Sequence, residues 1–137
     1  MLGEFFAALP GDIDDRLVEE GPYERMPTIE AKGLSEVTFA TLGEMLGIGR
    51  YDDLVEQVAE GPQTESGEAG ILTLPTELRD ALATVEDIDL VAERWAATDE
   101  LQDEWPPGEL RDVLREVRQL ARDARSSDRQ LWYWWSL

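Results

Sequence analysis

The sequence predicts an α+β domain in which five or six short helices surround a small sheet of about three short strands. Three observations predict this class. Residues 107–125 repeat their apolar side chains at helical spacing, the chain ends in an aromatic run typical of a strand, and shorter helical and extended patterns precede them. The length of 137 residues is near that of one domain, so we expect residues 1–137 to fold as a single domain.

The first third of the chain favours short helices and one strand. Residues 5–9 contain Phe, Phe and Leu at positions that fit an apolar helical turn. Residues 12–20 fit a short polar helix that ends at Gly21, which is followed by proline. Residues 27–33 alternate polar and apolar side chains, so we expect a short strand there.

Two further helices are predicted between residues 35 and 61. Ser35 is a suitable N-cap for the first, and Gly47 is placed to end it. Asp52 is a suitable N-cap for the second, which stops at Gly61, again followed by proline. We expect these two helices to pack as a hairpin because only a short turn joins them.

The middle of the chain combines a loop, a strand and two helices. Residues 61–70 are rich in Gly and polar side chains, which predicts an exposed flexible loop. Residues 71–74 form an apolar run that favours a strand. Thr76 is a suitable N-cap for a helix to about Val85, and a further helix from 87 to 98 would bury one apolar face.

The last predicted helix and strand show the clearest patterns. Residues 105–108, Trp-Pro-Pro-Gly, fit the start of the helix over 107–125. In the final strand, 130–137, Tyr133 and Trp135 would share one face, while Trp132 and Trp134 would share the other. We interpret it as a strand covered on both sides by helices, and the alternative is an aromatic face left open for a partner.

The charge is strongly negative. Thirty-one acidic residues against twelve basic ones give a formal net charge of −19, and Lys32 is the single lysine. Such a field repels nucleic acid and anionic membranes and attracts basic partners. Acidity of this kind also arises as adaptation to a salty cytoplasm, so that explanation stays open beside a functional one.

Several classes of chemistry lack their usual residues. There is no His and no Cys, so the side chains most often used as catalytic bases and thiol nucleophiles are missing. No calcium-binding loop, phosphate-binding loop, dinucleotide fingerprint or zinc spacing is present. We therefore predict no catalytic residues, no cofactor and no metal.

The opening segment has no basic region and no apolar run is long enough to cross a bilayer, so we expect a cytoplasmic protein.

Residues 42–49 resemble the helix-hairpin-helix DNA-binding motif, chiefly at the Gly-Ile-Gly turn that ends at Gly49. In that family the backbone amides of the turn hold a phosphate. Here Asp52 and Asp53 occupy the place where the phosphate would approach, and Leu46 replaces the usual proline. We interpret the segment as a plain turn between two helices.

The arginines of the last helix form a second pattern, because Arg111, Arg115, Arg118, Arg122 and Arg125 all lie on one flank of its apolar stripe. The simpler interpretation is that this flank pairs with acids on neighbouring elements. The alternative is a site for an anion or an acidic partner.

The function that best fits these observations is a non-catalytic acidic protein-binding module that docks or neutralises a basic partner, in the manner of an immunity protein, an antitoxin or a nucleic-acid mimic. The alternatives are a small carboxylate-dependent or metal-dependent enzyme, and an accessory subunit whose acidity reflects its host. We expect a basic protein as partner, with no direct contact to nucleic acid or membrane, and the oligomeric state stays open. The candidate partner-binding residues are Asp52, Asp53, Asp99, Glu100, Asp103, Glu104, Trp105, Arg111, Arg115, Arg118 and Arg122.

Overall fold

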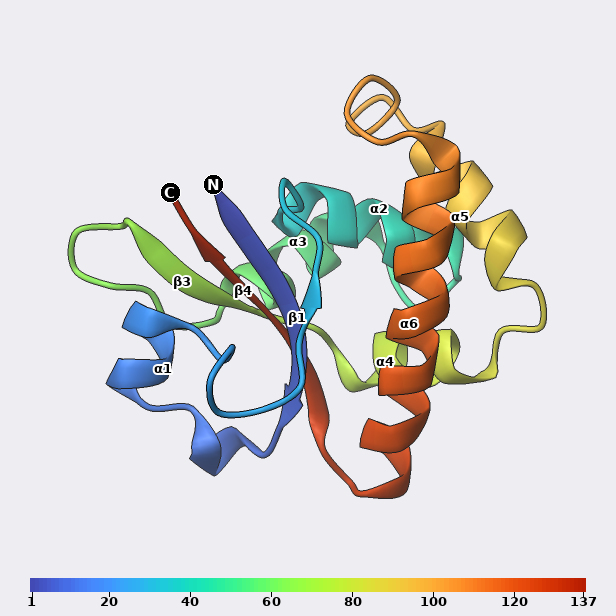
Figure 1. Ribbon diagram of the computed structural model, residues 1–137. Helices are drawn as coiled ribbons and strands as arrows, with labels where there is room; N and C mark the ends of the chain where they lie inside the picture. The colour runs from blue at the N-terminus through green and yellow to red at the C-terminus, as the bar shows by residue number, and fades with distance from the viewer.

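One antiparallel sheet organises the chain in the computed structural model, which describes residues 1–137 apart from the side chain of Pro107. The strands are β1 (Leu2–Ala8), β2 (Ile29–Glu30), β3 (Ala69–Thr73) and β4 (Gln130–Ser136), in the order β2-β1-β4-β3. The first and last strands of the chain therefore lie side by side at the centre of the sheet (Figure 1). The α+β class is confirmed, with four strands where about three were predicted.

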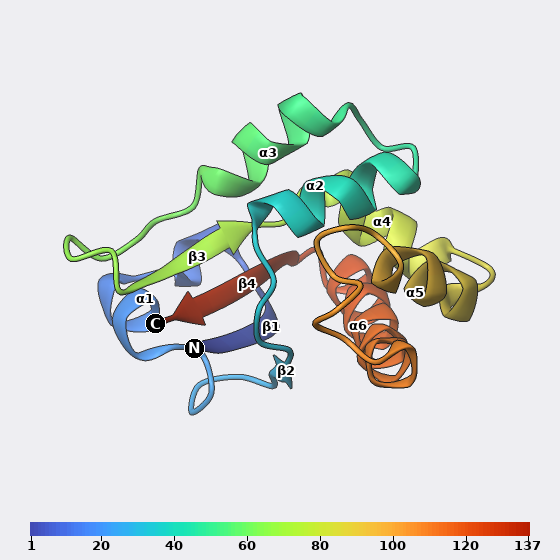
Figure 2. The same cartoon turned by 90° about the horizontal axis from the view of Figure 1, so that it is seen from above.

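Helices lie on both faces of this sheet. The larger group is α2 (Glu36–Met45), α3 (Tyr51–Ala59), α4 (Thr76–Thr84), α5 (Ile88–Ala96) and α6 (Pro107–Ser126). The smaller group is the 3-10 turn η1 (Pro10–Asp12) and α1 (Asp15–Glu20). Figure 2 shows α2 to α6 on one side of the strands, while α1 lies apart from them beside β1 and β3. Each side encloses its own apolar core, because alternate strand residues point to opposite faces.

The prediction of a helical turn at residues 5–9 is wrong, because this segment is part of β1. Phe5 and Phe6 are both fully buried, but they belong to the two different cores. A helical turn would have placed them on one side of the chain. Pairing along the whole length of β4 instead puts each ring into a separate core, so tertiary pairing overrides the local pattern.

Most helix positions are confirmed, although two predicted caps are wrong. Ser35 caps α2, and the Leu90 N–H donates to the Asp87 carboxylate at the start of α5. Helix α3 begins one residue before the predicted cap Asp52, because the carboxylate of Glu44 accepts a hydrogen bond from the Tyr51 N–H. Helix α4 begins at Thr76 itself, which was predicted to be its N-cap.

Two strands and the loop between the halves of the chain also differ from expectation. Strand β2 has two residues where a strand over 27–33 was predicted. Ala69 and Gly70 are buried in β3, so the exposed loop predicted for 61–70 is shorter than expected. Its first part lies along the edge of the sheet, since the Ile71 N–H donates to the Pro62 carbonyl at 2.8 Å. This pairing covers most of the otherwise free edge of β3.

Strand β4 is covered on both faces, as predicted. Tyr133 belongs to the larger core, and Trp132 and Trp134 belong to the smaller one. The indole N–H of Trp134 donates to the carbonyl of Val18 at 2.8 Å, which attaches α1 to the sheet. The alternative of an open aromatic face is wrong for these three residues, because all of them are buried.

Candidate functional site

The connection between α5 and α6, residues 97–106, carries most of the predicted acidic residues. Asp99, Glu100, Asp103 and Glu104 are all exposed, whereas Leu101 between them is fully buried. The buried leucine attaches the turns of this segment to the core. The backbone N–H of Trp105 donates to the carbonyl of Leu101 at 3.2 Å. We call this segment the acidic loop. It stands out from the end of α6 at the same end of the molecule as both chain termini (Figure 1).

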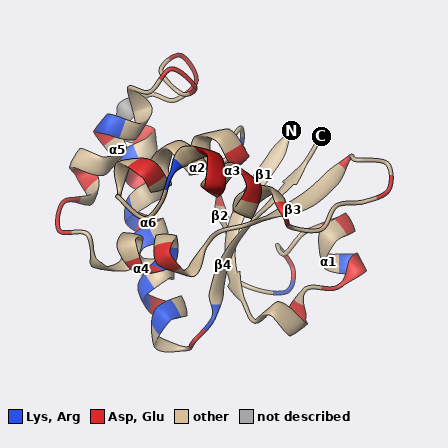
Figure 3. Cartoon of the chain, turned by 180° about the vertical axis from the view of Figure 1, so that it is seen from behind, with Lys and Arg blue, Asp and Glu red and all other residues tan. Residues whose placement is uncertain are grey.

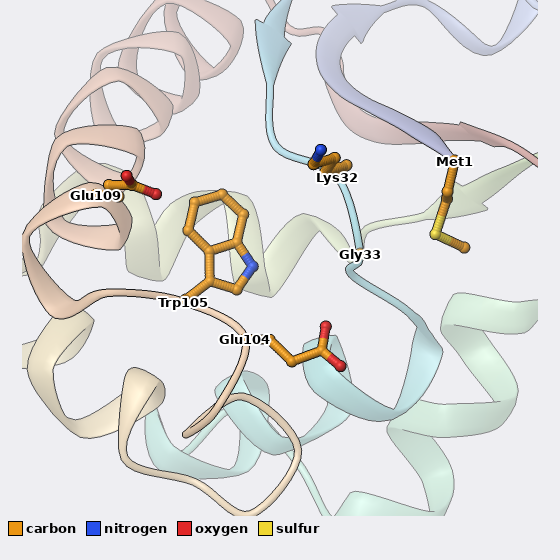
Figure 4. A pocket seen from close by; sticks show the side chains of 6 residues that line it. All are labelled: Met1, Lys32, Gly33, Glu104, Trp105 and Glu109. Atoms are coloured by element: carbon orange, nitrogen blue, oxygen red, sulfur yellow. The ribbon is translucent and has the colours of Figure 1, made fainter.

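A cavity of about 380 Å³ lies beside the acidic loop. We call it the Trp105 cavity, and its lining is Met1, Lys32, Gly33, Glu104, Trp105 and Glu109. Figure 4 shows the indole of Trp105 at its centre, with Glu109 and Lys32 on opposite sides of the ring. The cavity therefore combines an aromatic surface with two carboxylates and one ammonium group.

The backbone at Gly33 gives the cavity its shape on one side. Gly33 has a φ of +86°, which a residue with a side chain adopts only at a cost. A Cβ atom at this position would lie 3.6 Å from Oε2 of Glu104, so the carboxylate rests against the bare backbone. Lys32 forms no ion pair within the described part of the chain, although it lines the same cavity as two acids.

Two of the predicted arginines hold the helices together. Arg115 donates two hydrogen bonds to the carboxylate of Asp89, at 2.8 and 2.6 Å, and so joins α6 to α5. These bonds lower the pKa of the Asp89 carboxyl group. Arg122 donates to the carbonyl of Ala83 at 3.0 Å, close to the end of α4. The prediction that this flank pairs with acids on neighbouring elements is therefore confirmed at Arg115, and also at Arg125, which lies 3.8 Å from the carboxylate of Asp80 in α4. It is not confirmed at Arg122, whose acceptor is a backbone carbonyl.

Arg111 and Arg118 are not engaged in this way. Arg111 is exposed, and its ion-pair partner is its own neighbour Asp112 at 3.6 Å. Arg118 is partly buried and forms no ion pair with any residue that the structure describes. Figure 3 shows Lys and Arg along α6 and Asp and Glu on the acidic loop above it. A role for these two arginines in partner binding stays a prediction.

Asp52 and Asp53 lie apart from the acidic loop. Both are exposed in the first turn of α3, where their negative charges interact favourably with the positive end of the helix dipole. Helix α2 lies between α3 and the acidic loop in the view of Figure 2. The structure thus brings together Glu104 and Trp105 in one cavity, but it does not place Asp52 and Asp53 beside them.

Glu4 on β1 is a residue that the sequence did not single out. Its Oε2 atom is buried and has no hydrogen-bond partner among the described residues. Burial, followed by repulsion from its cross-strand neighbour Glu30, raises the pKa of the Glu4 carboxyl above its usual value. The sequence points to Glu4 only when residues 2–8 are assigned to a strand, because Glu4 then lies on the same face as the apolar residue Phe6.

Replacing Glu4 with glutamine is expected to stabilise the protein at neutral pH by roughly 1 kcal/mol, a modest value because the carboxyl is only partly buried. Its pKa is higher in the folded than in the unfolded chain. The protonated Glu4 carboxyl therefore contributes its full stability below the unfolded-state pKa, near 4.5. This contribution is lost as the pH rises through the folded-state pKa of Glu4. Denaturant unfolding of the Glu4→Gln variant and the natural protein at pH 7 and below pH 4 measures this.

The matched control is Glu30→Gln, which removes the repulsion but leaves the buried carboxyl in place. We expect it to stabilise less than Glu4→Gln. A Glu4→Gln gain that persisted unchanged at acidic pH would show that ionisation of Glu4 is not the cause.

The described residues show neither a metal-binding cluster nor a membrane-spanning helix. No three or more His, Cys, Asp or Glu residues in the described part of the chain are grouped so that they could hold a metal ion. None of the described helices has both the length and the apolarity needed to cross a bilayer.

Comparison with protein-family models, curated proteins and solved structures found no match. Function is therefore inferred from the residues and geometry of this chain.

Proposed function

We propose that this protein is a non-catalytic acidic binding module that docks or neutralises a basic protein partner, in the manner of an immunity protein, an antitoxin or a nucleic-acid mimic. The observation that carries the proposal is the acidic loop, where four exposed carboxylates lie within the six residues before Trp105 and one of them, Glu104, lines the Trp105 cavity. None of the four forms an ion pair with another described residue. They are therefore available to a cationic surface.

The charge balance of the whole chain supports the same proposal. The ion pairs among the described residues involve five of the thirty-one acids, namely Asp14, Glu20, Asp80, Asp89 and Asp112. The remaining negative charge acts as a long-range field that accelerates encounter with a basic protein. Tryptophan is among the residues that most often dominate binding energy at protein interfaces, so Trp105 is the expected anchor.

Neutralising the acidic loop is expected to abolish partner capture at low salt. The variant carries Asp99→Asn, Glu100→Gln, Asp103→Asn and Glu104→Gln, and it is immobilised beside the natural protein. Lysate of the host is applied, and bound proteins are eluted with increasing salt and identified by mass spectrometry. We expect a basic protein that binds the natural chain, elutes with salt and is missing from the loop variant.

The control variant makes the same charge change elsewhere, at the exposed residues Glu19, Glu24, Glu65 and Glu68. These lie on or next to α1 and on the turn before β3, so they leave the acidic loop intact. We expect this control to retain the partner. If both variants lost the partner equally, net charge alone would explain the binding and the acidic loop would have no specific part in it. If the natural chain captured no basic protein, the proposal would be contradicted.

The two alternatives have their own discriminating measurements. For a carboxylate enzyme, Glu4 is the specific candidate because its pKa is raised, and an activity lost in Glu4→Gln but kept in Glu30→Gln would favour that class. For an accessory subunit adapted to a salty cytoplasm, the melting temperature would rise steeply up to molar salt.

A further inference from the structure

The five tryptophans fall into two groups by what their indole N–H groups contact. Trp95, Trp132 and Trp134 donate to the backbone carbonyls of Thr38, Ala8 and Val18, at 2.9, 3.1 and 2.8 Å. Trp105 and Trp135 have no acceptor among the described residues, and both are only partly buried. Each of these two lines a cavity, so each has an apolar ring and a free N–H donor within reach of a ligand.

The two cavities adjoin one another. The second, which we call the Trp135 cavity, has a volume of about 350 Å³ and shares Met1 with the Trp105 cavity. The segment 32–36 runs along both, with Lys32 and Gly33 in the first and the next three residues in the second. We call the two adjoining cavities together the two-tryptophan groove, which extends from Trp105 to Trp135.

The lining of this groove is apolar with an acidic border. Leu72, Pro62 and Leu137 line the same cavity as Trp135, and Met1, which lines both cavities, is 63% exposed. Three carboxylates, from Glu36, Glu104 and Glu109, line the groove against the single ammonium group of Lys32. The exposed acids of the acidic loop extend the negative charge beyond the Trp105 end.

We propose that the two-tryptophan groove binds a segment of a partner protein in which apolar side chains are flanked by Lys or Arg. An apolar side chain of that segment packs against Trp135, and a cationic side chain lies over the Trp105 ring between Glu104 and Glu109. This inference rests on the proposed function and adds the chemistry of the bound segment. A second copy of this chain is a poor occupant, because its own charge of −19 would be repelled.

Lys32 has a defined place in this arrangement. It is a cation in the lining of a cavity that would receive another cation, so its charge repels that of the ligand. Removing it is expected to tighten binding, whereas removing Glu109 is expected to weaken it. For charges at the border of an interface we expect changes of roughly two- to fivefold in each direction.

The test begins with random peptides displayed on phage, selected on the natural protein. Enriched peptides are synthesised and titrated against protein labelled with ¹⁵N at the tryptophan indoles, and the Trp105→Phe and Trp135→Phe variants assign the two resonances. We expect enriched peptides that contain both Lys or Arg and large apolar residues. On titration, the indole signals of Trp105 and Trp135 should shift, and those of the three internally bonded tryptophans should not.

Exposed single substitutions complete the test without disturbing the core. Lys32→Ala should bind the selected peptides more tightly, Glu109→Gln more weakly, and Glu116→Gln on the same helix equally well. Basic peptides that leave both indole signals unmoved would overturn the groove but not the proposed function, since binding would then lie elsewhere. Enrichment of acidic peptides would overturn both.

Two further outcomes are also decisive. If no peptide is enriched over the bare support, the groove is overturned, and the lysate capture with the acidic-loop variant decides the proposed function separately. If the two indole signals shift with protein concentration in the absence of peptide, the groove is an interface between copies of this chain, and the proposal is likewise overturned.

Discussion

Replacing Trp95 with alanine is expected to lower the free energy of unfolding by about 3–5 kcal/mol. Trp95 is fully buried in α5, packs beside Phe39, and donates its indole N–H to the carbonyl of Thr38 at 2.9 Å. The substitution leaves a cavity and also removes the polar link between α5 and α2. The loss is a large share of the 5–15 kcal/mol that domains of this kind have in total, so thermal unfolding should shift by roughly 10–15 °C.

The variant Trp95→Phe separates the two contributions. It keeps most of the apolar volume but removes the indole N–H that donates to the carbonyl of Thr38, which we expect to cost about 0.5–1.5 kcal/mol. Denaturant unfolding of both variants measures the difference. A Trp95→Ala loss no larger than that of Trp95→Phe would mean that the larger core is not packed around this side chain.

Replacing Gly3 with alanine is expected to cost about 2–5 kcal/mol, although the change adds a single methyl group. A Cβ atom at Gly3 would overlap the hydroxyl oxygen of Tyr133 and would lie 2.9 Å from the carbonyl oxygen of Ala31. The Tyr133 hydroxyl donates to that carbonyl at 2.6 Å and accepts from the Leu34 N–H at 3.3 Å. Moving the ring would break both buried hydrogen bonds.

A second substitution tests this explanation directly. Tyr133→Phe removes the oxygen that the new methyl group would meet, and by itself should cost about 1–3 kcal/mol. The double variant Gly3→Ala/Tyr133→Phe is expected to lose less than the sum of the two single losses, because both changes act on the same contact. Equal or greater loss than the sum would show that the strain at Gly3 lies elsewhere.

The amphipathic helix and the final strand could be predicted from sequence because each pattern is local. Over 107–125 the apolar stripe is continuous, and α6 covers Pro107–Ser126. The aromatic run at 130–137 became β4, with both faces covered as its composition indicated. In both cases the local preference and the packing in the folded chain agree.

The strand β1 could not be recognised because its partner lies at the other end of the chain. Leu2 pairs with Ser136, and Ala8 pairs with Gln130. The segment by itself shows no alternation, because Phe5 and Phe6 are neighbours and each enters a different core. This apolar run can be recognised as a central strand only when β4 and the helices on both faces of the sheet are known.

The candidate site was predictable in its charge but not in its shape. Exposed acids at 99–104 follow from composition, since isolated carboxylates rarely leave water. The Trp105 cavity depends on Lys32 and Gly33, which reach it from a distant part of the sequence. The bonds from Arg115 to Asp89 and from Arg122 to Ala83 likewise depend on helix packing that no spacing along α6 reveals.

The most direct test of the acidic binding module is the dissociation constant of the captured partner, measured by calorimetry at several salt concentrations. The natural protein, the acidic-loop variant and the variant at Glu19, Glu24, Glu65 and Glu68 are compared. We predict that binding weakens with salt, that the acidic-loop variant binds weakly at every salt concentration, and that the second variant stays close to the natural protein. Affinity that is independent of salt, or unchanged in the acidic-loop variant, would contradict the account.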